Sequence, residues 1–320
     1  MRHPLKIGTR ESELATWQAT LVQQLLKENG FDSELIFIKS EGDKDLITPL
    51  YEIGVQGIFT KTLDAALLNN RIDLAVHSMK DVPTTLATGI SQAAVLKRAS
   101  YKDILVLKVN SEWSMGKDER SIQKSPLTIP HSPFTVATSS IRRKAQWLNR
   151  YPNHTIENLR GNVNTRLRKV EENDWNGAIF AAAGLERINL RPENSIDLDW
   201  MLPAPAQGAI TISCRKNDDF CLSACKSLND EATALCTKIE RDFLRTLLGG
   251  CSTPISALAV LENDKIIFKG NVCSVDGKEK YDISKEVAIE NADDLGAISG
   301  EELLQNEKAK KIIYDIRNAK

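Results

Sequence analysis

The chain has 320 residues, of which 42% are hydrophobic and 27% are charged. This composition is typical of a globular protein, and the length is sufficient for two or three domains. The formal net charge of -1 excludes a bulk attraction to nucleic acid or anionic membrane, so any basic surface must be local. No run approaches the roughly 20 apolar residues that span a bilayer, and residues 1–10 lack the apolar core of a signal peptide. We therefore expect a cytoplasmic protein.

The first elements predict an α/β sheet. Residues 5–9 and 34–39 have the composition of buried strands, and the helix between them begins after Ser12 and ends near Gly30. Strand, helix and strand in this order are typical of parallel sheets. Residues 40–57 hold three glycines and several charges, which favours a long mobile loop that acts as a lid.

The same alternation continues along the chain. Strands are expected at 72–76, 104–109, 134–137, 155–158 and 177–182, and helices at 60–69, after Ser140 and through Arg166. A second α/β unit begins near Tyr101, and the proline-containing segment 202–208 crosses between units. From residue 230 a third region is expected, with a helix to residue 248, paired strands at 256–260 and 266–273, and helices within 301–316.

Arginine follows three of the predicted strands directly, in the segments 9–12, 138–143 and 159–166. Ligands of α/β sheets bind at the carboxyl ends of the strands. Helix N-termini there attract anions, and the arginine guanidinium pairs with carboxylate or phosphate. Three such segments in a nearly neutral chain predict a site for a multiply anionic ligand. The alternative is that these arginines are solvated and pair with surface carboxylates.

Asp81 lies between a buried strand and Pro83, in the sequence Lys80-Asp81-Val82-Pro83. A carboxylate that faces a cleft beside cations stays ionised, so it can stabilise a cationic intermediate or transfer a proton. The alternative is an aspartate that only caps the turn. His77, inside the strand, is interpreted as a core histidine.

All six cysteines lie in the last third of the chain. Cys221 and Cys225 lack a nearby histidine or second cysteine pair, so zinc is not favoured, and most of these thiols are expected in the core. Cys251 differs because it follows a helix end and two glycines, which place it on a loop. An exposed thiol near cations is reactive, although an inert thiol remains the alternative.

Several segments resemble the porphobilinogen deaminases, also called hydroxymethylbilane synthases, and the resemblance spans nearly the whole chain. In chain order they are residues 7–12 (IGTRES), 17–19 (WQA), 77–83 (HSMKDVP), 138–143 (TSSIRR), 159–163 (LRGNV), 183–185 (AGL), 205–208 (PAQG) and 249–251 (GGC). The resemblance implies head-to-tail condensation of four porphobilinogen molecules to hydroxymethylbilane, with release of ammonia, in tetrapyrrole biosynthesis. It also implies a monomer.

The resemblance further assigns roles to residues of this chain. The growing product is anchored on a dipyrromethane cofactor, joined by a thioether to Cys251. Asp81 matches the catalytic aspartate, which assists ammonia loss and stabilises positive charge on the pyrrole nitrogens and the azafulvene intermediate. The positions that match cofactor- and substrate-binding residues are Arg10, Ser12, Lys61, Lys80, Thr138, Ser139, Ser140, Arg142, Arg143, Arg160, Asn162, Arg166, Arg187 and Gln207. No metal is implied.

The implied fold has two α/β domains that resemble periplasmic binding proteins, with the active cleft between them, and a smaller α+β C-terminal domain. Domain 1 would comprise residues 1–98 and 207–226, domain 2 residues 101–204, and domain 3 residues 229–320. Gln56, Asn164 and Ser213 replace a lysine, a glycine and a glutamate that are common in the family, and residues 111–133 form a longer segment than usual.

Two other functions remain open on the residues. A non-catalytic, anion-binding clamp of the periplasmic type has no need of a thiol at residue 251. An acyl-transfer enzyme with Cys251 as its nucleophile needs a general base nearby, and none of the four histidines lies in a supporting motif.

Overall fold

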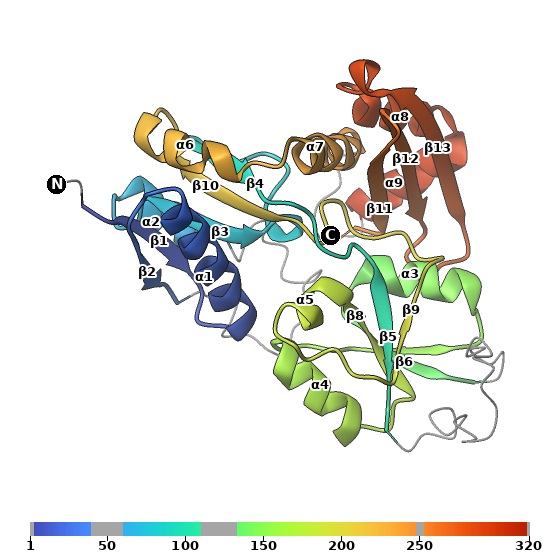
Figure 1. The fold of residues 1–320 in the computed structure, drawn as a ribbon. Coiled ribbons are helices and arrows are strands. Elements are labelled where there is room, and N and C mark those ends of the chain that lie inside the picture. Colours follow the sequence, from blue (N-terminus) through green and yellow to red (C-terminus); the bar gives the residue numbers. More distant parts are fainter. Residues whose placement is uncertain (1–2, 40–59, 110–132, 248–252, 319–320) are drawn as a thin grey trace.

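The computed structural model describes residues 3–39, 60–109, 133–247 and 253–318, which form three sheets flanked by helices (Figure 1). Cys251, the expected lid at 40–57 and almost all of segment 111–133 lie outside these residues. Within the described ranges, no helix is long and apolar enough to cross a membrane. The expected α/β fold with a smaller α+β unit is confirmed.

The first sheet has the strand order β2-β1-β3-β10-β4. Its strands are β1 (Leu5–Thr9), β2 (Ser33–Phe37), β3 (Leu74–Ser78), β4 (Ile90–Val95) and β10 (Ile210–Arg215), and its helices are α1 (Glu13–Glu28), α2 (Lys61–Leu68) and α6 (Asp219–Cys225). Strand β1 is parallel to β2 and β3, as expected, but β10 is antiparallel to both of its neighbours. The sheet is therefore mixed, because β10 belongs to a segment that returns from the second sheet.

The second sheet has the order β7-β6-β8-β5-β9. Its strands are β5 (Asp103–Leu107), β6 (Thr135–Ala137), β7 (Thr155–Glu157), β8 (Gly177–Ala181) and β9 (Ser195–Asp197), and its helices are α3 (Ile141–Arg150), α4 (Val163–Glu172) and α5 (Ala182–Glu186). Strands β6, β7 and β8 are parallel, and β5 is antiparallel to β8 and β9. Both sheets thus combine a parallel core with an antiparallel strand next to a crossing segment.

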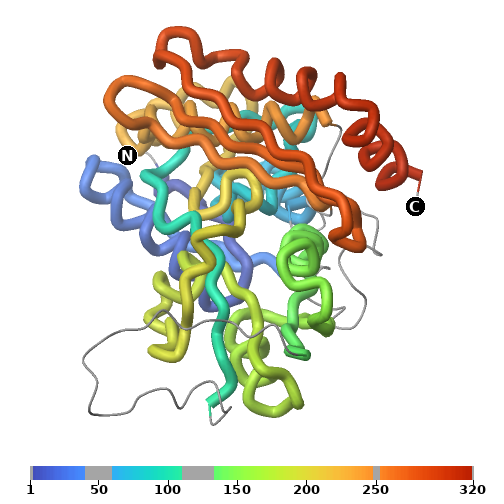
Figure 2. Tube along the Cα trace, turned by 90° about the vertical axis from the view of Figure 1, so that its right-hand side faces the viewer, coloured from blue at the N-terminus to red at the C-terminus, as the bar shows by residue number. Residues whose placement is uncertain are grey.

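The third unit is an antiparallel meander of β11 (Ile255–Glu262), β12 (Lys265–Cys273) and β13 (Lys280–Ala288), covered by α7 (Glu231–Thr246), α8 (Leu295–Gln305) and α9 (Glu307–Asn318) (Figure 2). Asn263 and Asp264 join β11 to β12 with φ angles of 49° and 59°, the left-handed geometry of a two-residue hairpin. Phe243 of α7 and Phe268 of β12 are fully buried and pack edge to face, so they centre this core.

All five cysteines of the described chain are free and buried, and all but Cys273 lie in the cores of the first and third units. They are Cys214, Cys221, Cys225, Cys236 and Cys273. Burial raises the pKa of each of these thiols, to about 11 for Cys214 and Cys236. The expectation that most of the thiols behave as small core hydrophobes is confirmed.

Two segments cross between the first and second sheets, residues 96–102 outward and residues 198–209 on return. They meet where the Ala99 amide donates to the Gly208 carbonyl at 3.1 Å. Gly208 has a φ of 88°, and a Cβ there would lie 2.6 Å from the Ser100 carbonyl oxygen. Only glycine fits this close approach without strain.

The third unit is tied to the crossing through one buried carboxylate. Glu240 of α7 is fully buried and accepts hydrogen bonds from both terminal nitrogens of Arg98, at 2.6 and 3.1 Å. The same carboxylate accepts from the backbone amides of Ala206, at 2.6 Å, and Ala259, at 2.8 Å. Glu240 therefore joins both crossing segments to the third unit.

We expect Glu240→Gln to lower the free energy of unfolding by about 3–5 kcal/mol, because it leaves the Arg98 guanidinium without its buried counter-ion. Chemical denaturation monitored by circular dichroism measures this change. The matched control is Glu286→Gln, which breaks an ion pair with Lys265 whose side chains are 58% and 53% exposed. Surface pairs contribute about 0–1 kcal/mol, so equal losses in the two variants would contradict this role for Glu240.

Candidate active site

A cavity of about 420 Å³ lies where the three units meet, and residues from all three line it. The first unit contributes residues 10–15, Gln18, Ser78, Lys80 and Asp81. The second contributes residues 138–143, 159–164, Arg166, 179–181, Gly184, Leu185 and Ile188, the returning segment contributes Ala204, Pro205 and Gln207, and the third unit contributes Leu244, Thr253 and Ile255. Segments that lie far apart in the sequence thus form the walls of one cavity.

Three helices begin at this cavity, each capped by a polar side chain that the sequence places after a strand. Ser12 caps α1 and accepts from the Ala15 amide, and Ser140 caps α3 and accepts from the Arg143 amide. Asn162 caps α4 and accepts from the Thr165 amide at 2.9 Å. The partial positive charges of three helix N-termini therefore converge on one space, which suits an anion.

The charged residues that line the cavity are mostly basic. The basic ones are Arg10, Lys80, Arg142, Arg143, Arg160 and Arg166, and the acidic ones are Glu11, Glu13 and Asp81. Although the chain is nearly neutral, its cavity carries an excess of positive charge. The three predicted arginine segments thus meet at one site, as expected for a site that binds several carboxylates.

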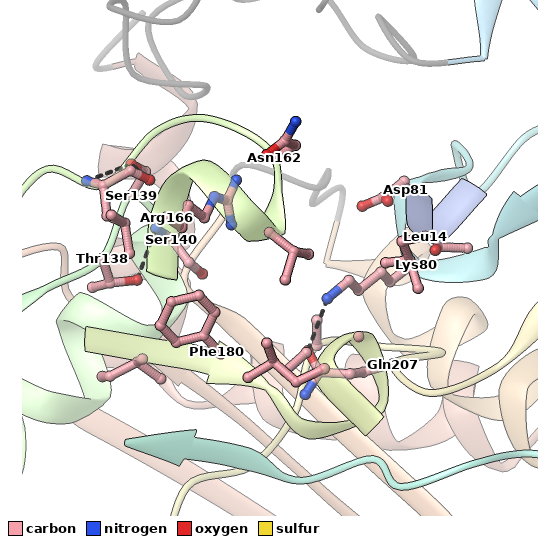
Figure 3. Close-up of a pocket in the computed structure, with 18 of the residues that line it drawn as sticks. Leu14, Lys80, Asp81, Thr138, Ser139, Ser140, Asn162, Arg166, Phe180 and Gln207 are labelled. Atoms are coloured by element: carbon pink, nitrogen blue, oxygen red, sulfur yellow. Dashed lines mark hydrogen bonds between the residues drawn. The ribbon is translucent and has the colours of Figure 1, made fainter. Parts of the chain in front are cut away.

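The hydroxyl residues of the second unit tie two of these segments together. The Ser139 hydroxyl donates to the Leu159 carbonyl at 2.6 Å and accepts from the Leu159 amide at 3.0 Å. Thr138 accepts from the Ser140 amide at 3.2 Å, as Figure 3 shows. The turn after β6 and the turn after β7 are therefore held in register at the cavity wall.

Asp81 and Arg166 approach the cavity from the first and second units, respectively (Figure 3). Burial lowers the pKa of Arg166 to about 10, Arg143 acts in the same direction, and the Asp81 carboxylate opposes both. Arg166 stays cationic at neutral pH. Asp81 is half-buried, and its charge interacts with that of Arg166 on the opposite wall.

Lys80 extends along the cavity wall beneath Asp81, and its ammonium donates to the side-chain oxygen of Gln207 at 3.3 Å (Figure 3). Burial lowers the pKa of Lys80 to about 8, with Arg143 and Arg142 acting in the same direction and Asp81 and Asp103 opposing them. The ammonium form therefore predominates at neutral pH, although by a smaller margin than for a solvated lysine.

Two residues that hold this wall were not predicted from the sequence. Asp103, fully buried at the start of β5, bonds Arg142, Arg143 and Gln207. Arg241 of α7 donates to the Val82 carbonyl at 2.9 Å and so supports the turn that carries Asp81, the short 3-10 helix Met79–Asp81. Asp103 could have been noticed in the sequence, because it is a single acidic residue at the start of an apolar strand. No local sequence pattern indicates Arg241.

Some of the expected site residues lie away from the lining of the cavity. Lys61 is exposed at the start of α2. Arg187 donates to the Gly208 carbonyl at 2.7 Å, and its guanidinium lies 5.8 Å from the centre of the Trp17 ring. Arg187 thus bridges α1 and the returning segment next to the cavity.

Asn164, which stands where the family commonly has glycine, makes a contact across the cavity. Its side-chain amide donates to the Glu13 carboxylate at 2.8 Å, which joins α4 of the second unit to α1 of the first. The helix still starts at Asn162, so the departure leaves the cap intact.

Cys251 lies outside the described residues. The nearest lining residues on either side of it in the chain are Leu244, which precedes it, and Thr253, which follows it. Ile255, at the start of β11, also lines the cavity. The chain on both sides of this cysteine therefore reaches the same cavity.

The fold and the cavity define an α/β protein with a cation-rich cavity between two sheets, next to a third unit. The chain belongs to the porphobilinogen deaminase family. Residues 5–223 match the family model "Porphobilinogen deaminase, dipyromethane cofactor binding domain", and residues 234–305 match the model of the C-terminal domain.

Relatives from distant organisms agree with this membership. The chain is 40% identical to the porphobilinogen deaminase of Syntrophotalea carbinolica, over 94% of this chain and 92% of the relative. It is 38% identical to that of Chloroherpeton thalassium, over 99% of both, and 39% identical to the chloroplastic one of Pisum sativum, over 94% and 81%.

Solved structures with similar folds are more distant. The periplasmic VFT2 domain of BvgS from Bordetella pertussis is 14% identical with a TM-score of 0.41, over 72% of this chain and 90% of that domain. A nutrient-binding protein from Burkholderia cenocepacia, bound to methionine, is 15% identical with a TM-score of 0.41, over 72% and 93%. Neither contributes to the functional argument.

His77 lies on the strand that leads to Asp81, where the sequence predicts a core histidine. Burial lowers its pKa to about 4, with a smaller effect of Arg10, compared with 6.5 for a solvated histidine. The unfolded chain therefore binds the proton more tightly, and stability is lost as pH falls from about 6.5 towards 4, by up to about 3 kcal/mol.

We expect His77→Gln to reduce this acid-induced loss, as measured by urea denaturation at pH 7, 5.5 and 4.5. The control is His3→Gln, since His3 is exposed, and it should keep the wild-type dependence on pH. If the His77→Gln variant lost as much stability between pH 7 and pH 4.5 as the wild-type protein does, His77 would not be held neutral in the fold.

Proposed function

We propose that this chain is a hydroxymethylbilane synthase that joins four porphobilinogen molecules head to tail and releases ammonia at each condensation. The observation that carries the proposal is the cation-rich cavity around Asp81, in a chain that belongs to the porphobilinogen deaminase family. Each pyrrole carries an acetate and a propionate, so negative charge accumulates with each addition, and an excess of cations is the chemistry that this requires.

The residues of the cavity fit a dipyrromethane, which has two pyrroles and therefore four carboxylates. Arg10, Arg160 and Arg166 supply guanidinium groups from two sides of the cavity, and Ser12 and Ser140 cap helix N-termini there. We infer that these residues hold the carboxylates, together with Lys80, Thr138, Ser139, Arg142, Arg143 and Asn162. When bound, the dipyrromethane supplies the pyrrole carbon to which the first porphobilinogen is joined.

Asp81 is the group we assign to the chemistry. Loss of ammonia from porphobilinogen leaves positive charge that spreads to the pyrrole nitrogen, and a carboxylate within reach of that nitrogen stabilises it. Asp81 lies on the cavity wall next to Lys80 and across the cavity from Arg166, and its charge interacts with both cations. The same carboxylate is placed to hold a proton during departure of the amine.

Cys251 is the residue we assign to covalent attachment of the dipyrromethane, through a thioether. Its neighbours Leu244, Thr253 and Ile255 line the cavity, which supports a thiol at the same space. The other cysteines of the described chain are buried and have raised pKa values. They are therefore poor candidates for attachment.

The two alternative functions are less well supported. A non-catalytic clamp would explain the cations, but it would not explain why a carboxylate, Asp81, lines the cavity among them. An acyl-transfer thiol needs a base, and among the described residues no histidine lines the cavity. His77 is buried, and His154 is stacked on Tyr151 and bonded to Trp147.

We propose three domains that correspond to the three sheets: residues 1–98 with 207–226, residues 101–204, and residues 229–320. In this assignment the crossing segments join domains 1 and 2, and Arg98 and Glu240 connect both to domain 3. We further propose that Lys61 and Arg187 contact the product chain as it lengthens, and that the protein is a cytoplasmic monomer.

The covalent attachment predicts a mass difference. Wild-type protein should exceed its polypeptide mass by one dipyrromethane in intact-mass spectrometry, and Cys251→Ala should have the bare polypeptide mass, because the thioether cannot form. Cys236→Ala, which changes a buried core thiol, is the matched control and should keep the added mass. Wild-type protein of bare mass that still produces hydroxymethylbilane would contradict the attachment.

The role of Asp81 predicts a large loss of turnover in Asp81→Asn, which keeps the shape of the side chain but removes its charge. We expect kcat for ammonia release from porphobilinogen to fall on the order of 10²- to 10⁴-fold, with an unchanged melting temperature. The control Asp199→Asn, at a side chain that is 73% exposed, should retain wild-type turnover. A normal kcat in Asp81→Asn would exclude the catalytic role.

A further inference from the structure

Asp103, at the head of β5, is a buried carboxylate that the reaction does not use directly. Its side chain is fully buried, and it is not one of the residues that line the cavity. It follows the outgoing crossing segment, so it lies where the second sheet begins. A charged group in this position is costly unless other groups neutralise it and satisfy its hydrogen bonds.

The partners of Asp103 are three lining residues of the cavity. One carboxylate oxygen accepts from a terminal nitrogen of Arg142 at 2.7 Å. The other accepts from Nε and a terminal nitrogen of Arg143, at 3.0 and 2.8 Å, and from the amide of Gln207 at 2.9 Å. Two arginines of α3 and a residue of the returning segment are therefore held by one side chain.

The network continues to the residue beside Asp81. Gln207 donates to Asp103 with its amide nitrogen and accepts from the ammonium of Lys80 with its oxygen, at 3.3 Å. The same amide nitrogen donates to the Tyr101 carbonyl at 2.8 Å, which fixes the orientation of the side chain. The position of Lys80 is thus linked to Asp103 through one glutamine.

Electrostatics explains why a carboxylate is needed in this place. Arg142 and Arg143 are 4% and 6% exposed, and two adjacent buried guanidinium groups repel each other. Burial would raise the pKa of Asp103, but Arg142 and Arg143 outweigh it, with Gln207 and Lys80 in support, and hold the pKa at about 2. One negative charge faces three cations, so positive charge remains in excess at the cavity.

Arg142 and Arg143 direct several of their hydrogen-bond donors at groups of the protein itself. Arg143 donates to Asp103 and to the Ile179 carbonyl, and Arg142 donates to Asp103 and to the Leu202 carbonyl. Much of their donor capacity is therefore directed at the protein. Their geometry is set by the fold, not by the ligand.

We propose that Asp103 is a positioning residue, which holds Arg142, Arg143 and Gln207, and through Gln207 the ammonium of Lys80, in the geometry that receives the carboxylates of the pyrrole chain. This inference rests on the proposed function and deepens it. Asp103 touches neither substrate nor cofactor and acts only through these side chains.

The test compares wild type with Asp103→Asn, both purified as the holoenzyme. We expect kcat/KM for porphobilinogen to fall on the order of tenfold to a hundredfold, because the guanidinium groups lose the carboxylate that orients them. The second readout is the pH at which Lys80 is half-labelled by acetic anhydride, measured by peptide mass spectrometry. It should move to lower pH, since Arg142 and Arg143 still disfavour the ammonium and only Asp81 remains to favour it.

The matched control is Asp73→Asn, which removes a carboxylate from Arg215 in the first unit, away from the cavity. It should leave kcat/KM and the labelling of Lys80 unchanged. An Asp103→Asn variant with wild-type kcat/KM would overturn the proposal, and so would a lower kcat/KM with unchanged labelling, because a purely structural role predicts that combination.

If Asp103→Asn does not fold, Asp103→Glu decides the question. This variant retains the charge, so Lys80 should label as in wild type, but the longer side chain displaces the guanidinium groups and kcat/KM should fall. A wild-type kcat/KM in Asp103→Glu would overturn the positioning role. Failure of the proposed function is distinct, because in that case the wild-type protein itself would release no ammonia from porphobilinogen.

Discussion

Repulsion between cations is the constraint on which this structure depends. The cavity brings together five arginines and a lysine in a chain whose net charge is close to zero. In water such groups would separate, so the fold must supply the free energy that holds them together. The buried carboxylate of Asp103 does so without cancelling the positive charge, since it neutralises only part of the charge of its neighbours.

The crossing segments connect this cluster of cations to all three units of the molecule. Gly208 and Ser100 lie so close that no Cβ fits between them, and Arg98 and Glu240 then join this contact to the third unit. Gln207, next to Gly208, bonds both Lys80 of the first unit and Asp103 of the second. The position of Asp81 relative to the arginines is therefore set at the crossing, where every unit contributes a bond.

One hydrogen bond across the cavity depends on Asn164, a residue in which this chain departs from the common family pattern. Asn164 and Glu13 join α4 to α1 by one hydrogen bond between the first and second units. Such an exposed bond contributes only about 1 kcal/mol to stability, so it is a minor part of the link between the two units.

Much of the fold could be predicted because its signals are local. Ser12, Ser140 and Asp230 cap the helices that their positions indicate, and the apolar runs before Arg10 and Ser139 form strands. Strands β4, β9, β10 and β13 were missed; β9 has only three residues, and β13 alternates charged and apolar residues at a sheet edge. The direction of β10 was also not predictable, because it depends on a strand order that only the crossing decides.

The sequence by itself identified the family, and its motifs predicted Asp81 and most of the cations that line the cavity. The tertiary structure alone decided how those cations coexist. Asp103 lies 39 residues from Arg142 and 104 from Gln207, so no local pattern links them. The physical reason is that caps and strands depend on neighbours in the chain, whereas the balance of buried charge depends on groups that only the folded chain brings together.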